Sequence, residues 1–309
     1  MIRVDEAEAA RRLGGLDLVA LMRMVLRGAA DGLGGGPVRA AFTTPRGLWF
    51  AAMPAWTDSP RAALGAKLVI AAPGNAERGL PTHRAVVVLL DPVSGEPAAW
   101  VEAEGLTRAR TAAVSVVATE TLARVPHGVH AILGAGAQGR AHVEAFARAG
   151  LMERLAVWSR DRARAGELAD AARGFGIDAR VADDPNDAVR GATVVTTCTA
   201  SAHPLFDDAA VADGTHLNAI GACVADRREL PGRLVGEAAL VVDDEAAART
   251  EAGDVILAVA EGAASWDGVA ELGAIFAGRA VPRGGRVSVF VSLGLGVEDV
   301  AAAAAVAGL

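Results

Sequence analysis

A buried apolar run that ends in closely spaced glycines constrains the fold of this chain more than any other feature. The run stops before Gly134, and Gly136 and Gly139 complete the spacing G-x-G-x-x-G. Residues 141–149 then continue at the period of a helix. In such a strand, turn and helix, the glycines permit a tight turn and a close backbone approach, and free helix N–H groups face an anion. The stretch from His130 to Phe146 therefore predicts a dinucleotide site.

The next predicted strand indicates which dinucleotide is preferred. Residues 154–158 (RLAVW) form that strand, and Ser159 and Arg160 follow it, where an NAD-binding protein usually has an acidic residue. A hydroxyl and a guanidinium suit the 2′-phosphate of NADP(H), so the sequence favours NADP(H) over NAD(H). Asp161 lies close enough to keep NAD(H) possible.

The rest of the pattern predicts an α/β protein with two domains. After residue 154 strands and helices alternate, which is typical of a Rossmann domain with a doubly wound parallel sheet. Residues 37–100 instead hold five short β-like runs separated by Gly and Pro, which indicates a largely antiparallel sheet in an α+β domain. Because residues 287–291 resemble those runs, we expect the chain to return to the first domain. The expected domains are 1–118 with 286–309, and 119–285.

Composition excludes several classes of protein. With 309 residues, 52% of them hydrophobic, the chain can bury two modest cores. No apolar run reaches the ~18 residues of a membrane span and no basic segment opens the chain, so we expect a cytoplasmic protein without a membrane partner. A net charge of -7 without a basic cluster argues against binding of nucleic acid. The absence of tyrosine excludes a phenolic proton donor, and neither the histidines nor the cysteines have a metal-ligand spacing.

Lysine usage singles out one side chain. Of the 30 basic residues only Lys67 is a lysine, and it lies inside the apolar run AKLVIAA. A partly buried lysine can be tuned toward neutrality and can exchange a proton, whereas arginine stays charged. Lys67 is therefore a candidate catalytic residue, and an ordinary strand lysine is the alternative.

A second candidate site lies at the predicted start of a helix. If Thr107 caps this helix, Arg108 and Arg110 occupy its first turn. Cations are unfavourable at that end of the helix dipole, and misplaced charge often marks a site. Because free N–H groups lie at the same place, we expect Arg110 to bind an anion such as a carboxylate. The alternative is that both arginines face solvent.

In this order the motifs resemble the ornithine cyclodeaminase and mu-crystallin family. The similarity extends from about Pro37 to Asp299. The matching segments are AAMPAW, KLV, PGN, GLP, LTRARTAA, GAGAQG, THLNAIGA, DRREL, EAGD and FVSLGLGVED. The resemblance implies an N-terminal domain that binds a small amino or imino acid and forms a homodimer. It also implies that the C-terminus completes this domain and that a Rossmann domain is joined to it.

The resemblance implies roles for particular residues as well. Arg39 and Arg110 match the residues that bind the substrate carboxylate, and Lys67 matches the lysine of the family pattern, which could also bind the substrate through its carboxylate or exchange the proton on nitrogen. Asp226 is the second candidate catalytic residue, orienting the imine nitrogen or stabilising an iminium. A bond to the backbone of its own loop is the alternative for Asp226. The expected cofactor contacts are Thr111, Gly134, Gly136, Ala137, Gln138, Gly139, Ser159, Arg160 and Asn218.

Three positions depart from the family pattern. At two of them ornithine cyclodeaminases share a carboxylate, and this chain has Ala51 and Cys223 there. At the third, Val291 replaces the lysine of the family pattern. Without the two carboxylates, binding and deprotonation of the distal amine of ornithine are disfavoured. The segment from Asp226 is instead similar to the mu-crystallin branch, which includes NADPH-dependent ketimine reductases.

These observations lead to one preferred function and two alternatives. We expect an NAD(P)H-dependent oxidoreductase that reduces a small imino (ketimine) acid, or dehydrogenates an amino acid, at Cα. Ornithine-type cyclodeamination, which gives proline and ammonia, is disfavoured by Ala51 and Cys223. Non-catalytic binding of NADPH or another ligand is disfavoured by the retention of Lys67 with both arginines.

Overall fold

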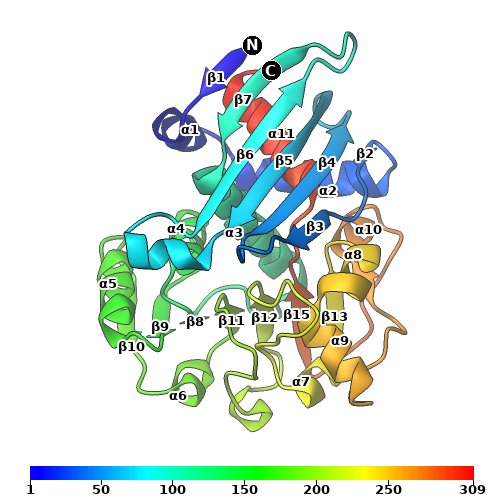
Figure 1. Ribbon diagram of the computed structural model, residues 1–309. Coiled ribbons are helices and arrows are strands. Elements are labelled where there is room, and N and C mark those ends of the chain that lie inside the picture. Colours follow the sequence, from blue (N-terminus) through cyan, green and yellow to red (C-terminus); the bar gives the residue numbers. More distant parts are fainter. The chain divides into compact units, whose positions relative to one another are not determined.

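The computed structural model describes residues 1–309, except the side chains of Pro73, Ala76 and Glu77. Pro73 belongs to the PGN segment noted above, so its side chain lies outside the described residues. The chain divides into unit 1, Met1–Thr111 with Gly294–Leu309, and unit 2, Ala112–Leu293 (Figure 1). The two chain crossings therefore fall at positions other than the expected residues 118 and 286.

Unit 1 is built on a seven-stranded sheet with the order β1-β7-β6-β5-β4-β2, in which β3 also pairs with β4. Its strands are β1 (Ile2–Val4), β2 (Gly34–Gly35), β3 (Ala40–Thr43), β4 (Trp49–Thr57), β5 (Ala63–Ala71), β6 (His83–Leu90) and β7 (Pro97–Glu102). β3 to β7 pair in antiparallel fashion, and β1 joins β7 in parallel. These five antiparallel strands are the five expected β-like runs, so that prediction is confirmed.

Helix α11 (Gly296–Ala307), red in Figure 1, packs on strands β4 to β7. Its sequence consists mainly of alanine and valine, and small side chains let a helix lie close to a sheet. Helices α1 (Glu6–Leu13) and α2 (Leu18–Ala30) also contact α11. Two further elements follow: a 3-10 turn (Pro73–Arg78) and α3 (Glu104–Leu122), of which residues 104–111 belong to unit 1 and residues 112–122 to unit 2.

The opposite face of this sheet is apolar and exposed. Burial alternates along β4, where Ala51 and Met53 are buried against the helix side and Trp56 is 41% exposed on the other side. Strand pairing places further exposed side chains on the same face as Trp56. We call this surface the outer face, defined by Phe42, Trp56, Ile70 and Trp100.

Unit 2 contains an eight-stranded parallel sheet with the order β10-β9-β8-β11-β12-β15-β13-β14. Its strands are β8 (Val129–Leu133), β9 (Arg154–Trp158), β10 (Asp178–Val181), β11 (Val194–Thr197), β12 (His216–Ala219), β13 (Ala238–Val242), β14 (Ala270–Glu271) and β15 (Val287–Val291). The chain moves outward from β8 to β10 and then returns to place β11 beside β8. This reversal is the position where doubly wound sheets bind ligands, and the predicted Rossmann fold is confirmed.

The placement of β15 corrects one expectation. Residues 287–291 do not return to the first sheet but lie between β12 and β13 of unit 2. Four of the five residues of β15 are buried, which is typical of a parallel strand covered on both faces. The apolar run resembled the strands of unit 1 because periodicity alone does not distinguish these two kinds of buried strand.

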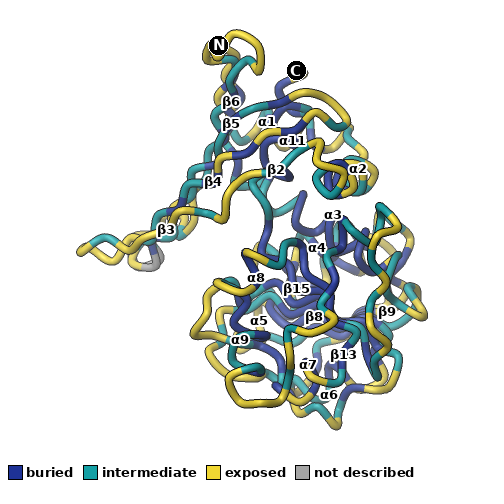
Figure 2. Tube along the Cα trace, turned by 90° about the vertical axis from the view of Figure 1, so that its right-hand side faces the viewer, coloured by how far each residue is buried: buried dark blue, intermediate teal, exposed yellow. Residues whose placement is uncertain are grey.

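Helices follow the strands of unit 2, and the dark core in Figure 2 lies along its sheet. They are α4 (Ala137–Arg148), α5 (Arg162–Arg173), α6 (Pro185–Val189), a 3-10 turn (Asp208–Ala210), α7 (Gly232–Gly236), α8 (Glu245–Glu251), α9 (Gly253–Ala260) and α10 (Leu272–Phe276). Within the described part of the chain, the helices are too short or too polar to cross a membrane. A cytoplasmic location stays a prediction.

Candidate active site

The glycine turn between β8 and α4 is shaped by close backbone contacts. Gly134 has φ +120°, and a Cβ there would lie 2.6 Å from the carbonyl oxygen of Cys198. A Cβ on Gly139 would lie 2.1 Å from the carbonyl oxygen of Gly134. Both positions therefore require glycine, because a methyl group would force the turn apart.

Gly136 differs from its two neighbours in the motif. It is the N-cap of α4, and a Cβ there would meet no heavy atom within 4 Å. No side chain caps the helix at this residue, so the first N–H groups, from Ala137 and Gln138 onward, lack an intrahelical partner. An open space in front of uncapped helix N–H groups fits the pyrophosphate of a dinucleotide.

A buried hydrogen-bond network around His142 holds the start of α4 beside this turn. Nδ1 of His142 lies 2.8 Å from the carbonyl oxygen of Gln138, and Nε2 lies 2.9 Å from Oγ of Ser115. Burial lowers the pKa of His142 to about 4, so the ring is neutral at physiological pH. The network therefore fixes the start of α4 without adding charge to it.

The end of β9 presents the residues expected to select the cofactor. Arg160 is exposed, and Oγ of Ser159 accepts the N–H of Asp161 at 3.3 Å. Asp161 is the N-cap of α5: its carboxylate accepts the N–H groups of Ala163 and Arg164. Because this carboxylate already has two helix N–H donors, it is less available to a ribose than Arg160 is to a phosphate.

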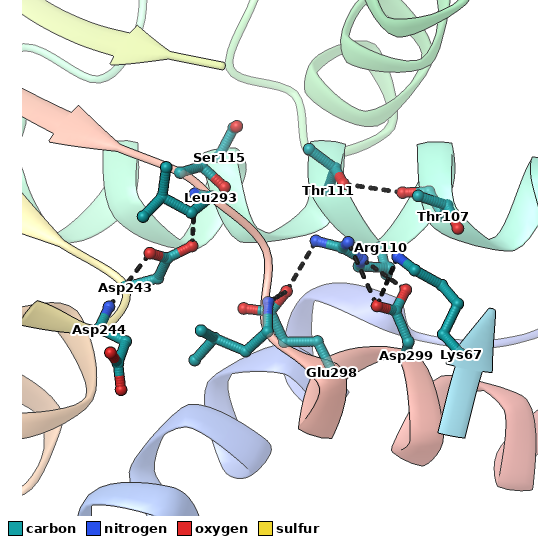
Figure 3. A network of polar contacts seen from close by, with 12 residues as sticks. Lys67, Thr107, Arg110, Thr111, Ser115, Asp243, Asp244, Leu293, Glu298 and Asp299 are labelled. Atoms are coloured by element: carbon teal, nitrogen blue, oxygen red, sulfur yellow. Dashed lines mark hydrogen bonds and ion pairs between the residues drawn. The ribbon is translucent and has the colours of Figure 1, made fainter. Parts of the chain in front are cut away.

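Unit 1 contains a buried cluster of two cations and two carboxylates (Figure 3). Nζ of Lys67 in β5 lies 2.6 Å from Oδ2 of Asp299. Arg110 in α3 donates from Nε to Oδ1 of Asp299 at 2.9 Å and from one terminal nitrogen to Glu298 at 2.8 Å. Their side chains are between 0% and 4% exposed. We call these four residues the acid cluster.

Burial lowers the pKa of Lys67 to about 8. Asp299 acts in the opposite direction, whereas Arg110 and Arg39 lower this pKa further. Burial alone would raise the pKa of Asp299, but Arg110 and Lys67 hold it below its usual value. The lowered pKa and its main cause, burial, agree with the expectation of a tuned lysine, whereas its carboxylate partner Asp299 was not foreseen.

The start of α3 corrects the helix-terminus argument for Arg110. The helix begins at Glu104, so Thr107 is not its cap, and Arg110 lies beyond the first turn. The carboxylate of Glu6 in α1 instead accepts the N–H groups of Glu104 and Gly105. The charge of Arg110 is balanced by Glu298 and Asp299. Its position therefore does not depend on the N–H groups at the start of α3.

The sequence reasoning missed Glu298 and Asp299. A signal was present, because both acids lie in the first turn of an otherwise apolar helix that is almost completely buried. Buried carboxylates need a cationic partner. Two acids in a buried helix therefore indicate that cations lie beside them.

The other predicted site residues belong partly to unit 1 and partly to unit 2. Arg39 is half-buried just before β3, close enough to lower the pKa of Lys67. Thr111 donates from its hydroxyl to the carbonyl oxygen of Thr107 at 2.8 Å. Asn218 is fully buried in β12, where its amide donates to Oγ1 of Thr119 at 2.9 Å. A cofactor contact by Asn218 stays a prediction. Its side-chain amide already donates a hydrogen bond inside unit 2.

Asp226 is exposed in the loop that follows β12. Two buried carboxylates anchor this loop: Glu229 accepts the N–H groups of Thr199 and Gly221, and Asp254 accepts those of Glu229 and Leu230. The loop is therefore tied to the ends of β11 and β12, which keeps Asp226 at the ligand-binding edge of the sheet.

Comparisons with known proteins identify the family and the fold of the chain. The model of the ornithine cyclodeaminase/mu-crystallin family matches residues 18–308. The ketimine reductase mu-crystallin of Mus musculus is 36% identical over 290 residues, which cover 93% of this chain and 90% of that protein. The Thermococcus litoralis Delta(1)-pyrroline-2-carboxylate reductase, solved with NADH and L-proline, has a TM-score of 0.93 and 27% identity, covering 100% of this chain and 97% of the other. An archaeal alanine dehydrogenase dimer with bound NAD has a TM-score of 0.92 and 28% identity, covering 100% and 95%.

Proposed function

Because the chain belongs to the ornithine cyclodeaminase/mu-crystallin family, we propose that it is an NAD(P)H-dependent reductase of small imino (ketimine) acids. Dehydrogenation of the corresponding amino acid at Cα is the reverse of the same reaction. The observation that carries the proposal is the acid cluster, in which a lysine with a pKa of about 8 is buried beside a fixed arginine. Such a pair combines recognition of an acid with exchange of a proton.

The cations of the site suit a substrate that carries a carboxylate. Arg39 and Arg110 both lie close enough to Lys67 to lower its pKa, so these three cations share one region of unit 1. Arg39 and Arg110 would bind that carboxylate, because guanidinium groups match its planar geometry.

Lys67 would handle the proton of the substrate nitrogen. With a pKa of about 8, its ammonium and amine forms are both populated near neutral pH. A bound reduced nicotinamide would supply the hydride. Asp226 would orient the imine nitrogen, and the acid-binding residues would hold the Cα in place for the transfer.

The cofactor is proposed to bind at the glycine turn of unit 2. Gly136 with the N–H groups of Ala137 and Gln138 would accept the pyrophosphate. Arg160, which is exposed after β9, favours the 2′-phosphate of NADP(H). NAD(H) remains an alternative, because two structurally similar reductases or dehydrogenases were solved with NADH or NAD.

A homodimer through the outer face is part of the proposal. Phe42, Trp56, Ile70 and Trp100 present large apolar side chains on one side of a sheet. Exposed apolar surfaces of this kind mark interfaces in otherwise polar proteins. The structurally similar alanine dehydrogenase is a dimer, which supports the assignment.

The test is a spectrophotometric assay of NADPH oxidation with cyclic and linear imino acids. We expect oxidation that depends on the imino acid and yields the matching amino acid. Proline formed from ornithine with catalytic cofactor would instead indicate cyclodeamination, which Ala51 and Cys223 disfavour. Tight NADPH binding without turnover of either substrate would refute the reductase and favour a binding role.

A further inference from the structure

We propose that Asp299 is the positioning residue of the acid cluster: one carboxylate from the C-terminal helix joins Lys67 to Arg110 and sets both for the incoming acid. The inference rests on the proposed function for the identity of that acid. It assigns a role to a residue that itself is not proposed to contact substrate or cofactor.

The geometry of Asp299 carries the proposal. Its Oδ2 lies 2.6 Å from Nζ of Lys67 and 3.4 Å from a terminal nitrogen of Arg110, and its Oδ1 lies 2.9 Å from Nε of Arg110. The three side chains come from β5, α3 and α11, as Figure 3 shows. Through these ion pairs, Asp299 of α11 links Lys67 of β5 to Arg110 of α3.

The electrostatic effect of Asp299 is directed at Lys67. Burial, Arg110 and Arg39 all favour the neutral amine, whereas Asp299 favours the ammonium. Asp299 lies in the first turn of α11, where the helix dipole stabilises a negative charge. Its carboxylate therefore keeps Lys67 partly protonated in a site that would otherwise remove the proton.

Glu298 provides a matched control in the same turn. It is as buried as Asp299, but it accepts from Arg110 at 2.8 Å and from the backbone N–H of Leu295 at 3.2 Å. The carboxylate that lies 2.6 Å from Nζ of Lys67 and raises its pKa is that of Asp299. Loss of its charge therefore perturbs Arg110 and the helix start without removing the partner of Lys67.

The single lysine of the chain allows a direct experiment. Protein grown with lysine carrying ¹³C at Cε gives one side-chain NMR signal, whose shift reports the titration of Lys67. In wild-type protein we expect a midpoint near 8. In Asp299→Asn the midpoint should fall by roughly 1 to 3 pH units, because an opposite charge at this distance supports the ammonium by that amount. In Glu298→Gln the shift should be clearly smaller.

Turnover provides a second readout that a purely structural role would not produce. In Asp299→Asn the loss of one negative charge is balanced by the lost proton of Lys67, and Arg110 keeps its bond to Glu298, so binding of a small carboxylate such as L-proline should change little. The kcat of this variant should fall at least about tenfold, because Lys67 loses its proton and its anchor. A structural defect would weaken acid binding and turnover together.

Two results would overturn the proposal: an unchanged Lys67 midpoint in Asp299→Asn, or an equal fall in Glu298→Gln. If Asp299→Asn does not fold, Asp299→Glu decides the matter. Its longer side chain retains the charge and displaces the carboxylate, so the midpoint should stay near 8 while kcat falls. Normal kcat in that variant would refute positioning. The NMR titration uses neither cofactor nor imino acid, so its outcome is independent of whether the chain is a reductase.

Discussion

The carbonyl oxygen of Gly134 occupies the space that a side chain at Gly139 would need. A Cβ at Gly139 would lie 2.1 Å from that oxygen, whereas a Cβ at Gly136 would meet nothing within 4 Å. The motif thus contains two glycines that the fold requires, Gly134 and Gly139, and one, Gly136, that only the proposed cofactor would require. The two roles can be separated by experiment.

Gly136→Ala should leave the fold intact and impair cofactor binding. The added methyl group projects into the open space assigned to the pyrophosphate, so the Kd for NADPH should rise at least about tenfold, or about 1.4 kcal/mol. The free energy of unfolding should change by about 1 kcal/mol or less. Gly139→Ala is the contrasting variant and should lose roughly 1–3 kcal/mol or fail to fold. Fluorescence titration and urea unfolding measure both, and an unimpaired Kd in Gly136→Ala would place the cofactor elsewhere.

Lys67→Met should lose turnover while retaining the cofactor. Removal of a proton-exchanging group costs roughly 10²- to 10⁴-fold in kcat, and the Kd for NADPH should stay within about twofold because the glycine turn belongs to unit 2. Arg84→Met, an exposed cation of the neighbouring strand β6, is the control. Near-normal kcat in Lys67→Met would remove this residue from the mechanism.

The pH profile should report the same lysine. Its pKa is lowered to about 8, so the ammonium that donates a proton is present below this pH and is lost above it. For imino acid reduction, kcat/KM should be flat below about pH 7 and fall up to tenfold for each pH unit above 8. The reverse oxidation, which needs the amine, should rise over the same interval. A reduction rate that increases from pH 8 to 10 contradicts this assignment.

Arg160→Asp should move the cofactor preference from NADP(H) toward NAD(H). The variant replaces an exposed cation after β9 by a carboxylate that repels a 2′-phosphate and can accept a ribose hydroxyl. The ratio of kcat/KM for NADPH over NADH should fall at least about tenfold. Arg162→Ala, which removes an exposed arginine paired with Asp183, should leave the ratio unchanged. Equal ratios in all three proteins would count against a role for Arg160.

Asp254 should make stability depend on pH. Burial and the neighbouring Glu229 raise the pKa of Asp254 from 3.8 to about 7. The folded state therefore binds a proton that the unfolded state has lost between about pH 4 and 7. This contribution to the free energy of unfolding is fully present below about pH 4 and is lost as the pH rises to 7. The loss amounts to up to about 1.4 kcal/mol per pH unit.

Asp254→Asn should abolish that contribution. Relative to wild type, the variant should be most stable at pH 8 and lose its advantage steadily toward pH 5, in urea unfolding at a series of pH values. Its amide oxygen can still accept from the backbone N–H groups of Glu229 and Leu230. Asp267→Asn, at an exposed position, is the control. A stability difference that does not vary with pH would refute the proposed ionisation.

Trp56→Glu should weaken the proposed homodimer. Placing a charge at the outer face costs at least about 2 kcal/mol at a central interface position, which is roughly 30-fold in the dimer Kd. Val281→Glu changes a side chain that is 89% exposed in unit 2 and should have no effect. Sedimentation velocity distinguishes the two, and a wild-type protein that is monomeric at micromolar concentration would exclude the dimer.

The sequence predicted those parts of the molecule that depend on neighbours in the chain. The glycine turn was predictable because its spacing is local, and the strands of unit 1 were predictable because Gly and Pro separate its short β-like runs. Lys67 was conspicuous because it is the one lysine among 30 basic residues. Such signals need no knowledge of the partner that each residue meets in the fold.

The contacts that were missed join distant segments. Arg110 and Asp299 are 189 residues apart, and Glu6 caps α3 from 98 residues upstream of Glu104. Strand β15 was assigned to the wrong sheet because an apolar run does not reveal which strands will flank it. In each case a tertiary partner overrode the local pattern.

The return of residues 294–309 to unit 1 has a consequence for biosynthesis. Lys67 and Arg110 leave the ribosome long before Asp299, so a nascent chain carries both cations without these counter-ions until α11 has been synthesised. Domains generally fold as they are synthesised, yet the first sheet must wait for α11 to cover it. We therefore expect unit 2 to be the part that acquires native structure first, and a chain shortened before α11 to retain the glycine turn while losing the acid cluster.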